Sequence, residues 1–198
     1  QGPAPAADQA ERRLQFVECM GANGVDLNVG AGDRGGRSEG PGDDGRLDAL
    51  GQTIVSALAG AATGHQVAFD QLTVSIEASK IVDVVKFLRD DPGCRFVNFI
   101  DVTAVDYPGR EKRFDVVYHL LSPYKNRRIR VKIRTDEETP VPTAIPVFPA
   151  ANWYEREMWE LYGIDIRNHG NLKRFLLPDD WDQGHPMRKN WTAPDFIK

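Results

Sequence analysis

The stretch RFDVVYHLLSPYKNRRIRVKIRT, residues 113–135, decides the fold class. Its two runs, Phe114–Leu121 and Arg127–Arg134, have the length and the β-branched content of strands. Ser122-Pro123 opens a short turn between them, so the two strands are expected to be antiparallel neighbours. Residues 95–105 are almost wholly apolar and end before the turn at 107–109, which predicts a third, central strand. The sequence therefore predicts a three-stranded antiparallel meander.

Two helices and a hairpin are predicted upstream of the meander. Residues 46–60 begin a helical pattern, with apolar side chains at Leu47, Leu50, Ile54, Leu58 and Ala61. QVAFDQLTVSIE, residues 66–77, alternates on both sides of Asp70-Gln71, which indicates a β-hairpin. Ser79 is a good N-cap for a second helix, and Asp91-Pro92-Gly93 ends it.

These elements predict an α+β fold, with helices packed on one face of a mainly antiparallel sheet, followed by a helix and an extended irregular C-terminal arm. We divide the chain into a flexible or partner-ordered arm (1–45), an α+β core (46–135), a proline-rich connector with a helix (136–163) and an extended docking tail (164–198). The arm holds eight acidic residues against four arginines, so it accounts for the whole net charge of −4.

Several classes of site are disfavoured by the residues. Cys19 and Cys94 form no C-x-x-C pair, so an iron–sulfur cluster or a structural zinc site is not expected. Gly30, Gly32 and Gly35 match G-x-G-x-x-G, but RSEGPGDDG follows where a dinucleotide site needs a helix. No apolar run reaches the roughly 20 residues that cross a bilayer. The chain is expected to bind no redox cofactor.

A basic strand face is predicted at 128–134. Arg128, Arg130, Lys132 and Arg134 alternate with Ile129, Val131 and Ile133. This pattern fits an edge strand kept soluble by charge, or a surface for an acidic protein partner. Nucleic-acid readers of this kind usually interleave aromatic residues for stacking, and none is present here. Nucleic-acid binding is therefore not expected.

The segment ANWYEREMWELYG, residues 151–163, predicts a helix over 153–162. Asn152 is placed as its N-cap, Glu155 stands at the capping-box position, and Gly163 ends it. Arg156 and Glu160 are spaced to pair at i, i+4. Glu155 and Glu157 point in different directions, so they do not form the convergent carboxylate pair of a hydrolase. Tyr154, Met158, Leu161 and Tyr162 share a face that is expected to anchor the helix on the core.

The tryptophans are better explained by docking than by a core. All four fall in the last 46 residues, where there is little regular structure to bury them. Trp159 lies off the anchoring face, and Trp181 and Trp191 lie in the tail. Tryptophan, tyrosine and arginine dominate interface hot spots. We therefore expect Trp159, Trp181 and Trp191 to be covered by another subunit.

At this point the residues resemble a known family. AANWYEREMWELYGI, the following His169, LKRFL at 172–176 and GHPMRK at 184–189 are similar to the signature of the thirty-kilodalton subunit of respiratory complex I. The resemblance covers roughly 47–190. Gly170-Asn171 and Asn190 depart from the family pattern, which leaves the path of the tail open. The docking residues it implies are Glu155, Arg156, Glu157, Trp159, His169, Lys173, Arg174, Trp181, His185, Arg188, Lys189 and Trp191.

The resemblance implies a non-catalytic core scaffold subunit in the hydrophilic arm of proton-pumping NADH:quinone oxidoreductase. The expected partners are the quinone-site subunits, with flavin and iron–sulfur clusters in partner chains and membrane contact only through the complex. An equivalent subunit of a membrane-bound hydrogenase is the alternative. The first residue, Gln1, favours a processed chain on the matrix side of the mitochondrial inner membrane; the cytoplasmic face of a bacterial plasma membrane is the other location.

Overall fold

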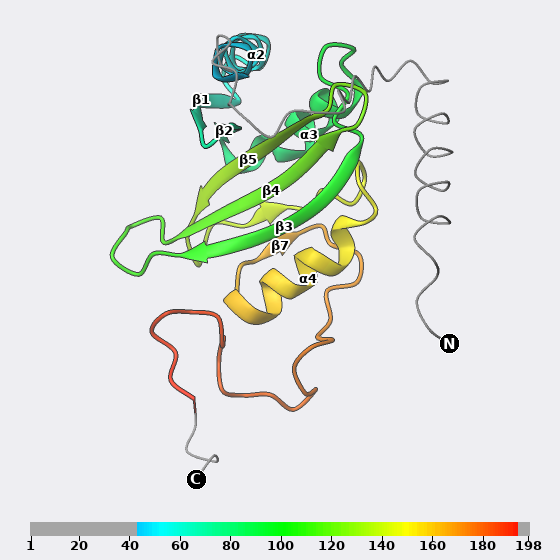
Figure 1. Ribbon diagram of the computed structural model, residues 1–198. Helices are drawn as coiled ribbons and strands as arrows, with labels where there is room; N and C mark the ends of the chain where they lie inside the picture. The colour runs from blue at the N-terminus through cyan, green and yellow to red at the C-terminus, as the bar shows by residue number, and fades with distance from the viewer. Residues whose placement is uncertain (1–42, 194–198) are drawn as a thin grey trace, which may run out of the picture.

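The computed structural model describes residues 43–193 (Figure 1). The expectation of a flexible arm therefore falls outside the described residues except at its last positions. There the first described helix, α2 (Asp43–Ala57), already begins, a few residues before the predicted start. Leu47 and Ile54 of its apolar stripe are buried, and Leu50 is partly buried against the core.

The sheet has five strands: β1 (Ala62–Ala68), β2 (Gln71–Ile76), β3 (Asn98–Asp106), β4 (Phe114–Ser122) and β5 (Arg127–Thr135). Their order is β1-β2-β5-β4-β3. The pairs β1–β2, β3–β4 and β4–β5 are antiparallel, whereas β2–β5 is parallel. The predicted fold class and the antiparallel meander are confirmed.

The structure reverses two predicted strand positions. The run at 95–105 was expected to be central, but β3 is an edge strand; the basic run was expected at an edge, but β5 lies between β2 and β4. Ile129, Val131 and Ile133 of β5 are buried, so the alternation predicted for this strand is correct. The edge prediction was wrong because β2 pairs with β5 across more than 50 intervening residues, a contact that local periodicity cannot reveal.

The hairpin is confirmed, with its turn one residue earlier than predicted. Phe69 and Asp70 both have positive φ, 54° and 57°. This conformation at both central residues belongs to the two-residue turn that matches the twist of antiparallel strands. Leu72, Val74 and Ile76 then point into the core from β2.

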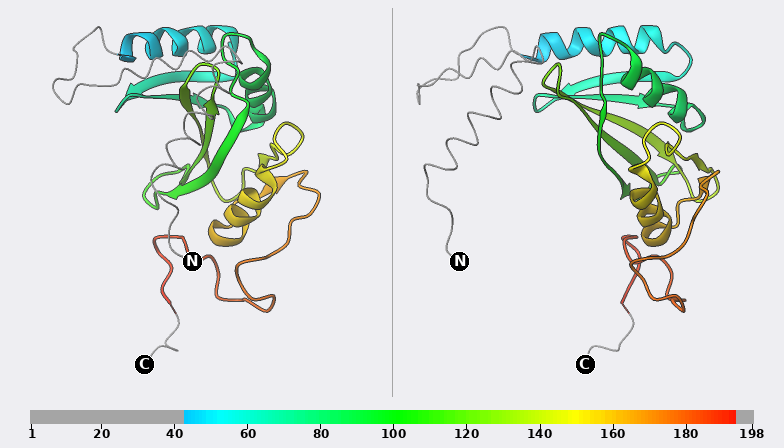
Figure 2. Two further views of the ribbon diagram at one scale, coloured as in Figure 1. Left: turned by 45° about the vertical axis from the view of Figure 1, so that its right-hand side comes forward. Right: turned by 90° about the vertical axis from the view of Figure 1, so that its right-hand side faces the viewer.

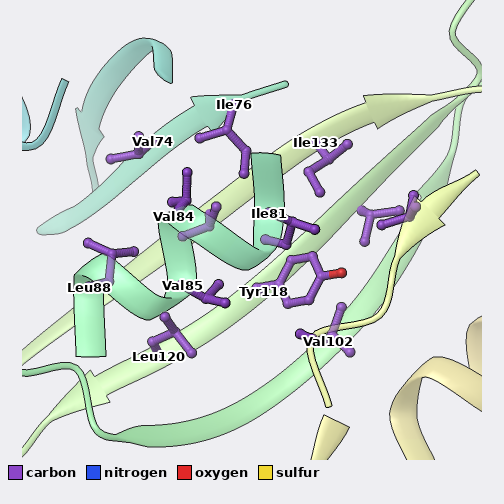
Figure 3. Close-up of a cluster of buried hydrophobic side chains, with 14 of the residues drawn as sticks. Val74, Ile76, Ile81, Val84, Val85, Leu88, Val102, Tyr118, Leu120 and Ile133 are labelled. Atoms are coloured by element: carbon purple, nitrogen blue, oxygen red, sulfur yellow. The ribbon is translucent and has the colours of Figure 1, made fainter. Parts of the chain in front are cut away.

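Helix α3 (Ile81–Asp90) covers the centre of the sheet. Its buried face, Ile81, Val84, Val85 and Leu88, packs over Tyr118, Leu120 and Ile133 (Figure 3). A single 3₁₀ turn, Ala78–Lys80, precedes it, so Ser79 lies inside that turn. The predicted Ser79 cap is wrong: the N-cap residue is Lys80, without a side-chain cap bond. The predicted stop at Asp91 is confirmed.

The other two helices lie toward the two edges of the same sheet face (Figure 2). Helix α2 packs on β1 and β2, where a side chain at Gly51 would overlap His65 and Leu72. Helix α4 (Ala151–Tyr162) packs on β3, with the Phe99 ring 5.9 Å from that of Tyr154. Within residues 43–193, no helix covers the opposite face, which we call the open face.

A small second sheet ties the connector to the tail. β6 (Val141–Pro142) and β7 (Ile166–Arg167) are parallel, and Thr143 N–H donates to the Arg167 carbonyl at 3.0 Å. From there to residue 193 the chain has no further helix or strand, and it passes around α4 (Figure 1). The irregular C-terminal arm is thus present, and it returns along the chain's own helix.

Candidate docking site on helix α4

Helix α4 begins and ends differently at its two termini. Its N-cap is Ala150, without a side-chain cap bond, and Asn152 lies inside the helix, so the predicted capping box is wrong. The C-terminal prediction is confirmed, because Gly163 has φ 73° and its N–H donates to the Trp159 carbonyl. A side chain at Gly163 would also overlap His185 and Arg188, so this position needs glycine for two reasons.

Glu155 fastens α4 to the connector instead of capping its own helix. Its side chain is fully buried and accepts hydrogen bonds from Thr143 Oγ1 at 2.5 Å and the Ala144 N–H at 2.7 Å. Burial raises the pKa of this carboxyl, and the two hydrogen bonds only partly oppose the shift. Glu155 therefore has a structural role and faces no cleft.

Arg156 holds the tail through backbone carbonyls. Its Nε donates to the Lys173 carbonyl at 2.7 Å and its Nη2 to the Arg174 carbonyl at 3.1 Å. The guanidinium also lies 4.6 Å from the centre of the Trp153 ring and 5.0 Å from that of Phe175. The predicted Arg156–Glu160 pair is wrong: among the described residues, no ion pair joins these two side chains.

Glu160 binds the next three residues of the same segment. Its carboxylate accepts from the N–H groups of Phe175 and Leu176, each at 3.2 Å, and of Leu177 at 2.5 Å. Glu160 is buried. Three converging backbone donors are the partners that a buried carboxylate needs to remain charged. Arg156 and Glu160 together fix residues 173–177 against α4.

The GHPMRK segment caps the C-terminus of α4. His185 Nδ1 lies 3.0 Å from the Glu160 carbonyl, the Met187 N–H donates to the Leu161 carbonyl, and Arg188 Nε donates to the Tyr162 carbonyl at 2.7 Å. The last carbonyls of a helix have no partner within the helix, and cations near them are favourable. His169 acts at the other end, 3.2 Å from the Asn152 carbonyl.

An ion network that sequence reasoning missed joins this segment to the β3–β4 hairpin. Arg113 forms two hydrogen bonds with the buried Asp106 carboxylate, at 2.7 and 2.8 Å. Glu137 bridges Arg113 and Arg188, and the Lys189 N–H donates to Asp106 at 2.8 Å. The Arg113 hydrogen bonds lower the pKa of Asp106. Because the partners are up to 83 positions apart, no local pattern reveals the network.

The tryptophans are not all in the expected places. Trp159 packs partly buried against the chain's own core, contrary to the expectation that it stands clear of it. Trp181 and Trp191 are half-buried against each other, with ring centres 6.3 Å apart, and each donates its indole N–H to a backbone carbonyl.

The exposed aromatic is Trp153, which the sequence analysis did not single out. Its side chain is 58% exposed and meets the Phe175 ring edge to face at 5.1 Å. Leu176 beside Phe175 is 53% exposed. We call Trp153, Phe175 and Leu176 the apolar patch. Because Arg156 and Glu160 order the backbone beneath it, the patch is held in place before any partner binds.

The remaining predicted docking side chains are at least partly exposed. Lys173 uses only its backbone carbonyl in the contacts described, and Arg174 donates to the Asp179 carbonyl at 3.0 Å. Glu157 lies on the exposed side of α4, and partial burial raises its pKa, with Asp101 and Glu160 adding to the shift. These groups surround the apolar patch with charge, as an interface rim requires.

The described residues contain no arrangement typical of catalysis. Between residues 43 and 193, no three His, Cys, Asp or Glu side chains gather closely enough to hold a metal ion. Cys94 is buried, and burial raises its thiol pKa to about 12, so it is not a reactive thiolate. None of the helices in this range has the length and hydropathy that a membrane crossing requires.

Comparison with known proteins identifies relatives of the chain. The family model described as the 30 Kd subunit of respiratory-chain NADH dehydrogenase matches residues 74–196. An NADH-quinone oxidoreductase subunit of this kind from Rhodopseudomonas palustris (strain TIE-1) is 56% identical over 156 residues, 79% of this chain and 76% of the relative. The NADH-quinone oxidoreductase subunit of the same name from Methylorubrum populi is 48% identical over 182 residues, 92% and 80%.

A solved structure has a similar fold. It belongs to the membrane-bound sulfane sulfur reductase, an archaeal respiratory membrane complex. The TM-score is 0.62 at 25% identity, and the match covers 74% of this chain and 86% of that chain.

Proposed function

Since the chain belongs to the family of the 30 Kd subunit of respiratory-chain NADH dehydrogenase, we propose that it is a scaffold subunit of NADH-quinone oxidoreductase. It supports electron transfer from NADH to quinone by holding neighbouring subunits and has no catalytic residues of its own. The oxidoreductase activity belongs to the assembled complex.

One observation supports a scaffold role most strongly: the charged residues of α4 bind the chain itself. Glu155 binds Thr143 and Ala144, while Arg156 and Glu160 bind residues 173–177. These groups are buried and fully engaged, so they are not available to a substrate. What the arrangement leaves exposed is the apolar patch, a rigid aromatic surface of the kind that anchors protein interfaces.

We infer that the partners at this patch are the quinone-site subunits of the hydrophilic arm. Flavin and iron–sulfur clusters would be bound by other chains of the complex, and membrane contact would be made through the complex alone. The relatives named above are bacterial, which favours the cytoplasmic face of a plasma membrane. The mitochondrial location favoured by Gln1 remains a prediction.

The two alternative functions have less support. A subunit of a hydrogenase-like complex would resemble the archaeal reductase more closely than NADH-quinone oxidoreductase, but the identities are 25% and 48–56% respectively. A nucleic-acid module would need aromatic residues among the cations of β5, and that strand has none.

The test is co-purification from membranes. The chain is tagged at its gene in the organism that encodes it, and detergent-solubilised membranes are passed over the affinity resin. We expect the tag to retain NADH:quinone oxidoreductase activity together with the other subunits. Trp153→Asp should reduce that retained activity while leaving the melting temperature of the free chain unchanged. Recovery of the folded, tagged chain alone would refute the proposal.

A further inference from the structure

The open face of the sheet carries an excess of positive charge at its centre. Four cations, Arg128, Arg130, Lys132 and Arg134, project from β5, which is flanked on both sides by strands. Side chains two residues apart on a strand are about 6.6 Å apart, so the four span roughly 20 Å in one row. Like charges in such a row repel one another unless anions lie between them.

One carboxylate serves the end of the row that holds Lys132 and Arg134. Asp115 on β4 lies 3.3 Å from Lys132, 3.9 Å from Arg134 and 3.3 Å from Arg110 on the neighbouring loop. Three cations thus share a single, almost fully buried carboxylate. This end of the row keeps a net positive charge.

The other end, Arg128 and Arg130, has no anion at all among residues 43–193. The residues paired with Arg130 across the sheet are Thr73 on β2 and His119 on β4, both uncharged when the histidine is neutral. Arg130 Nε is buried without a hydrogen-bond partner. The nearest facing acid, Asp101, lies beyond His119 on β3, roughly 10 Å away by strand spacing.

An unpaired, partly desolvated guanidinium in mid-sheet reduces stability unless something binds it. Here it borders a hollow of about 240 Å³, lined also by Arg128, His119 and Ile100. Ile100 is 48% exposed. The hollow is small for a cofactor but accepts one or two side chains, an acid for the arginines and an apolar group for Ile100.

A second hollow, of about 480 Å³, lies at the opposite end of the row beside Lys112, Lys132 and Arg134. Two hollows joined by a row of cations fit an extended segment better than a compact ligand. Bidentate carboxylate binding is the ordinary use of arginine at protein interfaces. The row lacks the aromatic residues that stack nucleic-acid bases.

From these observations we infer that the open face binds an extended acidic segment, about six residues long, from a neighbouring subunit. Its carboxylates pair with Arg128 and Arg130, and an apolar side chain rests on Ile100. This surface lies on the side of the sheet away from α4, so it is separate from the apolar patch. The inference rests on the proposed function, since it requires the chain to be part of a complex.

Site-specific photo-cross-linking in the assembled complex tests the inference. Arg128 is exposed, so p-benzoylphenylalanine at this position should be tolerated. The matched control places the same group at Arg46, an exposed arginine on α2. We expect position 128 to capture a segment of another subunit that holds at least two Asp or Glu residues, and position 46 not to capture it.

Charge reversal then tests the chemistry. Arg128→Glu should lower retention of the chain on the complex in high salt by roughly tenfold, because a desolvated charge partner is lost. Arg128→Lys should retain most of the binding, and reversing the acids of the captured segment to Lys should rescue the Glu variant. The melting temperature of each free variant checks that the fold is intact.

The outcomes separate the two proposals. If the chain co-purifies with the complex but position 128 captures nothing, captures lipid or nucleic acid, or captures a segment without acids, the inference about the open face is wrong and the scaffold function stands. If the unmodified chain does not co-purify with any complex, the scaffold function is wrong and the inference fails with it.

Discussion

Arg156 and Glu160 stand one turn apart on α4, yet each binds the backbone of the tail and not the other. Arg156 donates to the carbonyls of 173 and 174, and Glu160 accepts from the N–H groups of 175, 176 and 177. Five consecutive residues are thereby fixed by two side chains. The tail therefore has a defined path without forming a helix or strand of its own.

Glu160→Ala should detach residues 175–177. It leaves three backbone donors without their charged acceptor, so we expect a loss of about 2–4 kcal/mol in the free energy of unfolding. Urea denaturation measures the loss, and hydrogen exchange should become faster at the three amides. Glu157→Ala, on the exposed side of the same helix, is the control and should change stability by less than about 0.5 kcal/mol. Equal effects of the two variants would contradict the assignment.

Gly163→Ala should destabilise the fold, because the residue has φ 73° and a methyl group would overlap His185 and Arg188. We expect a loss of about 1–3 kcal/mol. Gly170→Ala is the matched control, since nothing lies within contact distance of its added carbon and its φ is not positive. Thermal unfolding of both variants gives the comparison, and a stable G163A protein would refute the described capping by the GHPMRK segment.

The Asp106–Arg113 contact should depend on pH. Because the pKa of Asp106 is lowered in the folded state, its contribution to stability is present above the unfolded carboxyl pKa of about 3.9 and is lost as the pH falls through the folded value. Asp106→Asn should thus be less stable than the wild type at neutral pH, with the difference shrinking below about pH 4. Urea midpoints measured across this range test it; a pH-independent difference would argue against an ionised Asp106.

Glu155 should show the opposite dependence. Its folded-state pKa is raised by burial, so the wild type loses stability relative to Glu155→Gln as the pH rises above about 4.3. The glutamine can still accept from Ala144 and donate to Thr143, which preserves the geometry. The difference between the two unfolding free energies, followed from acid to neutral pH, is the measurement. A difference that moves in favour of the wild type would mean that Glu155 is stabilised as a carboxylate.

Local patterns predicted the elements but not their long-range contacts. Apolar alternation identified β1, β2, β4 and β5, and Gly163 marked the end of α4, because these features depend on residues a few positions apart. The parallel pairing of β2 with β5 could not be read in this way, so β5 was misplaced at an edge. Proline and glycine did correctly exclude regular structure after β7.

The site was predicted less well for the same reason. Glu155 at the capping-box position suggested a local role, whereas its partners Thr143 and Ala144 lie upstream of the helix. Arg156 and Glu160 suggested a pair, whereas each has its partners 15 to 18 positions downstream. The density of tryptophan and arginine correctly drew attention to this region, but exposure alone distinguishes Trp153 from Trp159, and exposure follows from the tertiary fold.

The exposure of Trp153 in the assembled complex tests the scaffold account most directly. Hydroxyl-radical labelling is compared between the free chain and the purified NADH:quinone oxidoreductase, with the fully buried Tyr118 as the residue that should stay unlabelled in both. We predict that Trp153, 58% exposed in the chain alone, loses most of its labelling in the complex, together with Phe175. Equal labelling of Trp153 in the free chain and in the complex would contradict docking through the apolar patch.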